Sequence, residues 1–143
     1  MNLNASNIIA FNNYARKMRG GRIDFDWAYK YQCVDLIRDY ANYRSYPAIT
    51  TRGNAIDLWR KGLGNNYVRV VNTMLATPPV GAIMLYSNWE FGHIALAWRS
   101  SLLWVELLEQ NANTWNWEWL WEDAIRVKRN YYHNCLGWFI PKN

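Results

Sequence analysis

The 143-residue sequence predicts one α+β domain in which helices come first along the chain and strands follow. Three segments with apolar residues at helical spacing occupy the first half, and short runs rich in β-branched and aromatic residues occupy the second half. Hydrophobic residues make up 51% of the chain and charged residues 19%, as is typical of a globular protein. We therefore expect N-terminal helices packed on an antiparallel sheet.

The first expected helix begins near Ser6, a residue that can cap it, and ends before Gly20 and Gly21. The second runs from about 33 to 43, and the third from 54 to 61. Period-two patterns then predict strands, with a turn at 99–101 joining an antiparallel pair. The expected strands cover 67–71, 82–86, 93–98, 104–111, 125–132 and 137–140.

The net charge of +5 favours an anionic partner such as a cell wall, a membrane surface or nucleic acid. Lysine and arginine are scattered along the chain, with their closest run at 126–129, so we expect no nucleic-acid partner. Apolar runs stay shorter than the roughly 18 residues of a membrane span, so we expect no membrane insertion. Residues 1–6 lack the pattern of a signal peptide. We expect a monomer.

The chain has two cysteines and two histidines, which makes the search for a nucleophile short. Cys33 opens an expected helix, whose N-terminal dipole and free N–H groups stabilise a thiolate. Cys135 lies in an aromatic run that is more typical of a buried small hydrophobe. A disulfide between the two is the alternative. We expect free thiols, because a disulfide would consume the better nucleophile.

His93 follows a glycine at the start of an expected strand, where a rigid element can hold its ring. It could take the thiol proton of Cys33 and later protonate a leaving group. Such a histidine needs a third group that orients it, and Glu109 and Asn111 share one face of the neighbouring strand. Gln32 could donate to an oxyanion together with the backbone N–H of Cys33. The alternatives are a structural histidine and a solvent-facing glutamate.

Four ordered blocks of sequence resemble one known family. Residues 24–36, Asp-Phe-Asp-Trp-Ala-Tyr-Lys-Tyr-Gln-Cys-Val-Asp-Leu, resemble the catalytic-cysteine segment of the CHAP family, the cysteine- and histidine-dependent amidohydrolases/peptidases. The other blocks are Gly-Asn-Ala-Ile-Asp at 53–57, Gly-His-Ile-Ala at 92–95 and Glu-Gln-Asn at 109–111, and the ending at 137–141 is similar as well. The resemblance implies a single papain-like domain over 1–143 with a barrel-like sheet, and no separate wall-binding domain is recognised.

The resemblance also implies cleavage of an amide bond in bacterial peptidoglycan. It assigns Cys33 as nucleophile, His93 as general base and acid, and Glu109, with Asn111 nearby, as the orienting group. The most similar proteins are bacteriophage endolysins and virion-associated wall hydrolases. They imply a Gram-positive wall as partner and synthesis in the host cytoplasm, followed by holin-type release or carriage on a virion.

Several functional alternatives stay open at this point. The enzyme could be an N-acetylmuramoyl-L-alanine amidase or an endopeptidase, which cleave different amide bonds of peptidoglycan. The chain could also be a non-catalytic wall-binding or virion structural module of the same fold. A thiol deamidase or transamidase is the third alternative.

Three aspartates near the expected catalytic helix indicate a calcium site. Asp24, Asp26 and Asp35 offer hard oxygen ligands at the spacing that some phage CHAP domains use for Ca²⁺. Ala28 and Lys30 would contribute only their backbone carbonyl oxygens. We expect Ca²⁺ as a cofactor, and the alternative is a loop of solvated carboxylates with Asp35 capping the helix.

Aromatic residues are numerous, with ten tryptophans and ten tyrosines. Tryptophans alternate with other residues between 115 and 121, which indicates one aromatic face if this stretch is extended. We expect that face to pack against the protein, and stacking on glycan sugars is the alternative.

Overall fold

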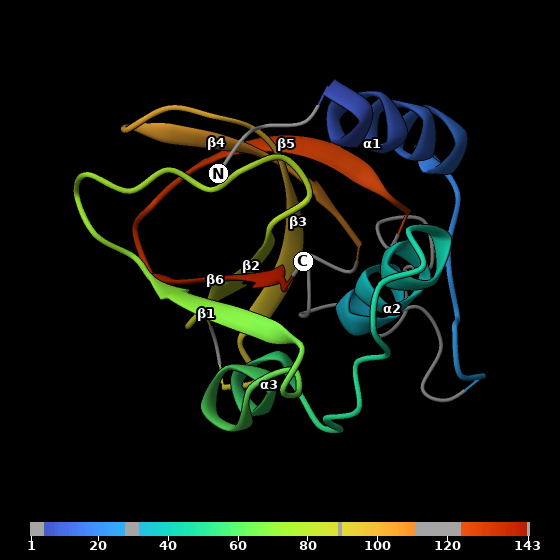
Figure 1. Ribbon diagram of the computed structural model, residues 1–143, viewed down its shortest axis with the longest axis horizontal. Helices are drawn as coiled ribbons and strands as arrows, with labels where there is room; N and C mark the ends of the chain where they lie inside the picture. Colours follow the sequence, from blue (N-terminus) through green and yellow to red (C-terminus); the bar gives the residue numbers. More distant parts are fainter. Residues whose placement is uncertain (1–4, 28–31, 89, 111–123, 143) are drawn as a thin grey trace.

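The computed structural model describes residues 5–27, 32–88, 90–110 and 124–142. In this part of the chain, three helices come first and six strands follow, as predicted (Figure 1). Within the described residues, the helices are too short or too polar to cross a membrane. The elements are α1 (Ala5–Met18), α2 (Cys33–Tyr43), α3 (Ala55–Lys61), β1 (Tyr67–Val71), β2 (Ile83–Tyr86), β3 (His93–Ser100), β4 (Trp104–Glu109), β5 (Arg126–Tyr131) and β6 (Cys135–Pro141).

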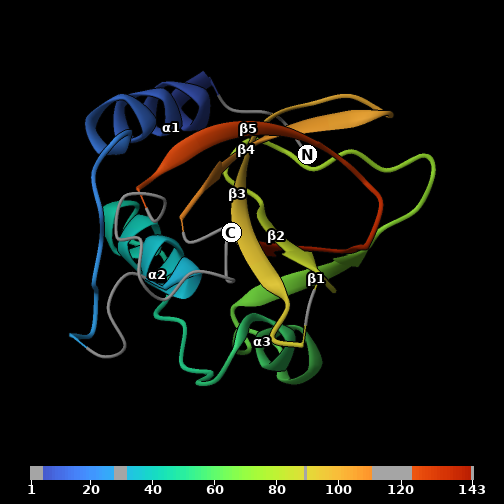
Figure 2. The ribbon, with the colours of Figure 1, turned by 180° about the vertical axis from the view of Figure 1, so that it is seen from behind.

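The strands form one antiparallel sheet in the order β1-β6-β2-β3-β4-β5. The α+β class with N-terminal helices is therefore confirmed. The sheet curves without closing, because β1 and β5 form its two edges in the described part of the chain (Figures 1 and 2). Helix α2 packs against β3, and α3 packs against β2 and β3, so the middle of the sheet carries the helices.

Side chains on both faces of the sheet are buried. Leu85, Ile94 and Leu96 join the core that the sheet shares with the helices. Their neighbours Met84 and Ala95 belong to a second core on the opposite face. This follows from the period-two geometry of a strand, in which successive side chains point to opposite faces. Strand β2 is consequently apolar over its whole length, and a buried polar side chain at the end of its neighbour β3 needs a partner.

Most predicted boundaries agree with the structure, and one turn was predicted two residues too early. Strand β3 continues to Ser100, with a bulge between Ala97 and Arg99. The turn follows at Ser101, whose hydroxyl accepts hydrogen bonds from the backbone N–H groups of Leu103 and Trp104. The serine side chain therefore sets this turn, and hydropathy patterning does not detect such a bond.

The short helix α3 holds the turn that precedes His93. The backbone N–H of Ile56 donates to the carbonyl of Phe91 at 3.0 Å. Gly92 follows with a φ of +69°, and a Cβ built there would lie 2.9 Å from the carbonyl oxygen of Tyr86 and 3.0 Å from the nitrogen of Ile56. The glycine in front of His93 is thus required by close packing as well as by its backbone conformation.

We predict that Gly92→Ala destabilises the protein more than Gly20→Ala. Both glycines have a positive φ, +69° and +78°, so both variants carry the backbone strain of roughly 1–2 kcal/mol. At Gly20 nothing lies within 4 Å of the added methyl group. The clash at Gly92 adds about 1–3 kcal/mol to the loss in free energy of unfolding. Urea denaturation followed by tryptophan fluorescence measures both, and equal losses would contradict the packing argument.

Candidate active site

Cys33 is the first residue of α2, as the sequence predicts. Gln32 precedes it in an extended conformation, and its backbone N–H donates to the carboxylate of Asp35 at 2.8 Å. This bond is the reciprocal half of a capping box, in which the third helical residue accepts from the residue before the helix. The helix therefore begins sharply at Cys33, whose half-buried thiol lies at the end where the first backbone N–H groups have no intrahelical partners.

His93 and Glu109 meet on adjacent strands. His93 opens β3 and Glu109 ends β4, and His93 Nε2 lies 3.0 Å from Glu109 Oε2. Both side chains are almost fully buried, at 5% and 3% exposed. The other carboxylate oxygen, Oε1, accepts from Arg126 Nε at 3.0 Å, and Arg126 lies directly opposite Glu109 on β5. Three neighbouring strands thus supply one chain of charged groups.

The electrostatics of these three side chains favour the charged forms of both His93 and Glu109. Burial raises the pKa of Glu109, but the hydrogen bonds and charges of His93 and Arg126 outweigh it and hold that pKa below its ordinary value. Burial likewise lowers the pKa of His93, and hydrogen bonds with Cys33 and Glu109 outweigh it and raise that pKa to about 9. The fold therefore brings Cys33, His93 and Glu109 together from distant parts of the sequence.

Gln110 joins the start of α2 to the sheet. It is fully buried, and its side-chain oxygen accepts from the backbone N–H of Ile23 at 2.8 Å. Its amide nitrogen donates to the carbonyl of Ile23 at 2.7 Å and to the carbonyl of Gln32 at 2.8 Å. The residue before Cys33 is therefore tied to the residue after Glu109.

The sequence analysis gave neither Gln110 nor Arg126 a role. Strand alternation carried a signal for Gln110, because it must face away from its neighbour Glu109. Arg126 was counted only within a basic run, although antiparallel pairing of β4 with β5 would have placed it opposite Glu109. The proposed orienting residue Asn111 lies outside the described residues. Both thiols are free, as expected, and Cys135 is buried.

The three aspartates also come together. Carboxylate oxygens of Asp24, Asp26 and Asp35 all lie within 4.8 Å of one another. Oδ1 of Asp24 is buried without a hydrogen-bond partner, which leaves one acceptor open for a cation. Burial raises the pKa of Asp35 to about 6, against hydrogen bonds from the backbone of Gln32 and Phe25, and the charges of Asp26 and Asp24 add to the rise.

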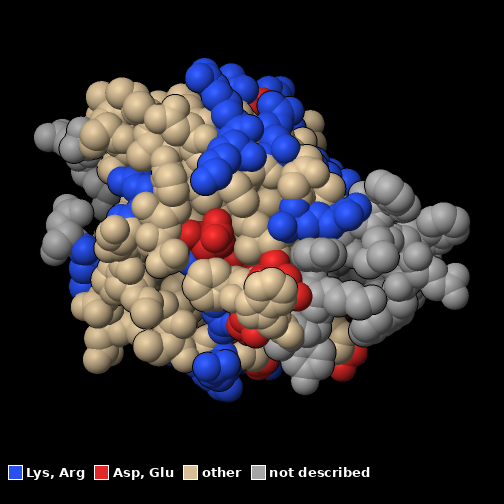
Figure 3. All heavy atoms as spheres, turned by 90° about the vertical axis from the view of Figure 1, so that its right-hand side faces the viewer, with Lys and Arg blue, Asp and Glu red and all other residues tan. Residues whose placement is uncertain are grey.

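These three carboxylates fit a hard divalent cation, because it would supply the positive charge that the cluster lacks. Ala28 and Lys30, the two expected carbonyl ligands, lie outside the described residues, as does the tryptophan stretch at 115–121. Figure 3 views the molecule from the right-hand side of Figure 1, and a small group of acidic side chains lies in the middle of that face. Basic side chains gather above it, where α1 lies in Figure 1.

No protein-family model matches the chain. It is 29% identical over 127 residues to endolysin PlyTW of Staphylococcus phage Twort, which covers 84% of this chain and 27% of PlyTW. It is 31% identical over 100 residues to endolysin LysK of Staphylococcus phage K, which covers 67% of this chain and 20% of LysK. The chain is thus homologous to one part of these staphylococcal phage endolysins and spans only a minor share of their length.

Solved structures show the same fold. Endolysin LysIME-EF1 superimposes with a TM-score of 0.76 at 20% identity, over 94% of this chain and 63% of that one. Ly7917 superimposes with a TM-score of 0.60 at 13% identity, over 94% of this chain and 62% of that one. A structure of Ly7917 with the hydrolyzing product of MDP gives 0.61 at 13% identity, over 95% of this chain and 63% of that one. The chain therefore has an endolysin-like α+β fold.

We predict that Glu109→Gln lowers the pKa of His93 from about 9 toward its ordinary 6.5. Loss of the carboxylate removes a group that stabilises the imidazolium, while burial continues to oppose the charged ring. An NMR titration of the His93 ring measures the shift. Glu106→Gln is the matched control, because Glu106 lies on the same strand and pairs with Arg99 and Arg129 instead. A His93 pKa that stays near 9 in Glu109→Gln would contradict the pairing.

Proposed function

We propose that this chain is a CHAP-type catalytic domain that hydrolyses an amide bond of Gram-positive peptidoglycan through Cys33. The observation that carries the proposal is the meeting of Cys33, at a helix N-terminus, with His93 and its carboxylate partner Glu109. Homology to part of two staphylococcal phage endolysins supports the substrate class. The net charge of +5 is suited to an anionic wall.

In the proposed reaction, the thiol proton passes to His93 before the attack, because the raised pKa of His93 favours the imidazolium, and the Cys33 sulfur then attacks the carbonyl carbon of the scissile amide. The tetrahedral intermediate collapses to a thioester, and the imidazolium of His93 gives its proton to the departing amine. His93 then accepts a proton from water, whose oxygen attacks the thioester and releases the acid and the free thiol. The raised pKa of His93 suits this cycle, because the imidazolium is available at neutral pH when the amine leaves.

Glu109 and Arg126 would keep the histidine in position throughout this cycle. The bond from Glu109 to Nε2 fixes the ring and leaves Nδ1 as the nitrogen for the thiol. Arg126 binds the second carboxylate oxygen, so Glu109 remains ionised despite its burial. In the proposal, Glu109 and Arg126 are positioning residues, and the proton moves only between sulfur, histidine, substrate and water.

The proposed oxyanion site is the N-terminus of α2. The backbone N–H of Cys33 and the side chain of Gln32 would donate to the oxyanion of the intermediate. Support comes from the anchoring of Gln32, whose carbonyl accepts from buried Gln110 and whose N–H is held by Asp35. A donor on a backbone that is fixed at both ends loses little entropy when the transition state forms.

We also propose that Asp24, Asp26 and Asp35 hold Ca²⁺, with carbonyl oxygens of Ala28 and Lys30 completing the shell. When bound, the cation would neutralise the carboxylates beside the start of α2 and so keep the segment before Cys33 in place. The unpartnered Oδ1 of Asp24 and the close approach of three carboxylates support this role. As with phage endolysins, we infer synthesis in the host cytoplasm and action on the cell wall.

We predict that Cys33→Ala abolishes the release of peptides and amines from purified staphylococcal walls, by at least about a thousandfold, because the covalent step loses its nucleophile. Cys135→Ala is the matched control, since it removes the other thiol, which is buried and contacts the carbonyl of Gly137. It should retain activity. Circular dichroism confirms that both variants fold, and mass spectrometry of the products identifies the bond. Equal activity of Cys33→Ala would refute the thiol mechanism.

We predict that Ca²⁺ raises the melting temperature relative to chelator, and that Asp24→Asn removes most of this rise. A ligand that binds only the folded state stabilises by mass action, about 2.7 kcal/mol at one hundred times its Kd. Glu90→Gln is the control, because this exposed carboxylate is not part of the cluster. Differential scanning calorimetry with Ca²⁺ and with EDTA measures the effect. A rise that persists fully in Asp24→Asn would place the cation elsewhere.

A further inference from the structure

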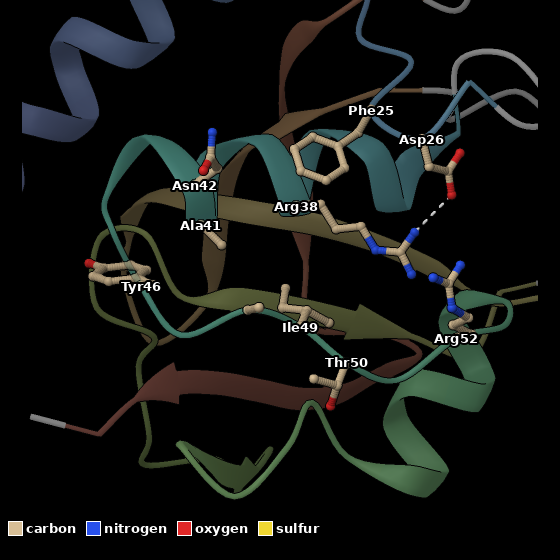
Figure 4. Close-up of a pocket in the computed structure, with 10 residues that line it drawn as sticks. Phe25, Asp26, Arg38, Ala41, Asn42, Tyr46, Ile49, Thr50 and Arg52 are labelled. Carbon is tan, nitrogen blue, oxygen red and sulfur yellow. Dashed lines mark hydrogen bonds and ion pairs between the residues drawn. The ribbon is translucent and has the colours of Figure 1, made fainter.

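A cavity of about 450 Å³ lies beside the nucleophile helix and outside the Cys33, His93 and Glu109 group. It is enclosed by α2, by the segment before that helix and by residues 46–52 after it (Figure 4). Phe25, Ala41 and Ile49 supply apolar walls. Arg38 and Arg52 stand at one end, with their guanidinium groups directed toward each other. The cavity therefore combines an apolar lining with a concentrated positive charge.

The charge at this end is only partly compensated. Arg38 binds the carboxylate of Asp26 at 3.1 Å and the carbonyl of Thr51 at 3.3 Å. Arg52 is exposed and makes no hydrogen bond or ion pair with any other residue that the structure describes. Only one of the two guanidinium groups thus has a carboxylate partner among the described residues. An anion between them would relieve their repulsion and could accept charge-assisted hydrogen bonds from both.

The volume and the lining of the cavity indicate which kind of anion it could bind. Its volume falls within the roughly 300–1,000 Å³ of small-ligand sites. The walls at Ala41 and Ile49 suit a short aliphatic side chain, and the guanidinium forks suit a planar carboxylate. The free C-terminus of a peptide that ends in alanine presents such a carboxylate joined to a small aliphatic group.

The cavity adjoins the helix that begins with Cys33. Arg38 follows Cys33 by five residues on this helix, about 7.5 Å along the helix axis and roughly 140° around it. Phe25 and Asp26 belong to the segment that leads into α2. A peptide anchored here would have its chain beside the start of α2.

We propose that this cavity binds the free carboxyl end of an alanine-terminated wall peptide, with Arg38 and Arg52 as its anion ligands. The proposal rests on the function proposed above and names a substrate feature that the enzyme would recognise. Asn42 and Thr50 line the same cavity and could bind the last peptide group. Arg52 would act mainly on substrate affinity, because it lies outside the Cys33 group.

The test measures binding in the Cys33→Ala protein, so that no probe is cleaved. Acetyl-lysyl-D-alanyl-D-alanine and its C-terminal amide are titrated by NMR in the Cys33→Ala background and in the same background with Arg52→Ala. The acid should bind at least about tenfold more tightly than the amide, and Arg52→Ala should lose about tenfold for the acid only. Arg52→Lys should retain part of the affinity. Arg19→Ala is the control for net charge, because Arg19 is exposed and lies outside the cavity.

Three results would overturn the proposal: no binding of the acid, equal binding of acid and amide, or unchanged affinity in Arg52→Ala. Glycerol 3-phosphate that binds more tightly than the peptide acid would also overturn it, by assigning the cavity to a phosphodiester polymer. Because the assay needs no catalysis, its outcome is independent of the hydrolysis assay. A protein that binds the acid through Arg52 and fails to release wall products would retain this site and lose the proposed function.

Discussion

The buried amide of Gln110 determines where the thiol of Cys33 lies relative to the sheet. Its three hydrogen bonds hold the backbone of Ile23 and the carbonyl of Gln32, and the residue has no exposed surface. A buried polar group that loses its partner costs about 1–3 kcal/mol, so each of these bonds strongly restricts alternative positions of the helix start. Glu109, the last residue of β4, immediately precedes Gln110 and binds His93. Two adjacent residues thus position the thiol of Cys33 and the ring of His93.

Burial explains why the carboxylate of Glu109 needs two partners. A carboxylate inside the sheet loses its hydration, which favours the neutral acid. His93 and Arg126 restore the lost interactions, one at each carboxylate oxygen, and the charged form prevails. The same carboxylate then sustains the imidazolium of His93 against its own burial. Removal of Glu109 would leave the imidazolium of His93 buried without its carboxylate, whereas Arg126 is partly exposed and would keep contact with water.

The sequence predicted the fold class, nearly every element and the three chemical groups of the site, because each depends on local patterns. Helix α2 begins at Cys33 because of a local capping bond, and strand periodicity placed His93 at the start of β3. Contacts between distant segments were not predictable in this way. Gln110 pairs with Ile23 across 87 residues, and the cavity between α2 and residues 46–52 exists only after the chain has packed. A hydropathy pattern predicts neither the contact of Gln110 with Ile23 nor this cavity.

The segment before α2 links the two proposed sites through one carboxylate. Asp26 belongs to the acidic cluster with Asp24 and Asp35, and it also binds Arg38 at the edge of the cavity. A cation in the cluster would attract the carboxylate of Asp26, which now compensates the charge of Arg38. The guanidinium of Arg38 would then attract an anionic ligand more strongly. Linkage makes this effect reciprocal, and a bound carboxylate would in turn favour the cation. The carboxylates of the segment directly before α2 would thus couple cation binding to binding of the proposed peptide end.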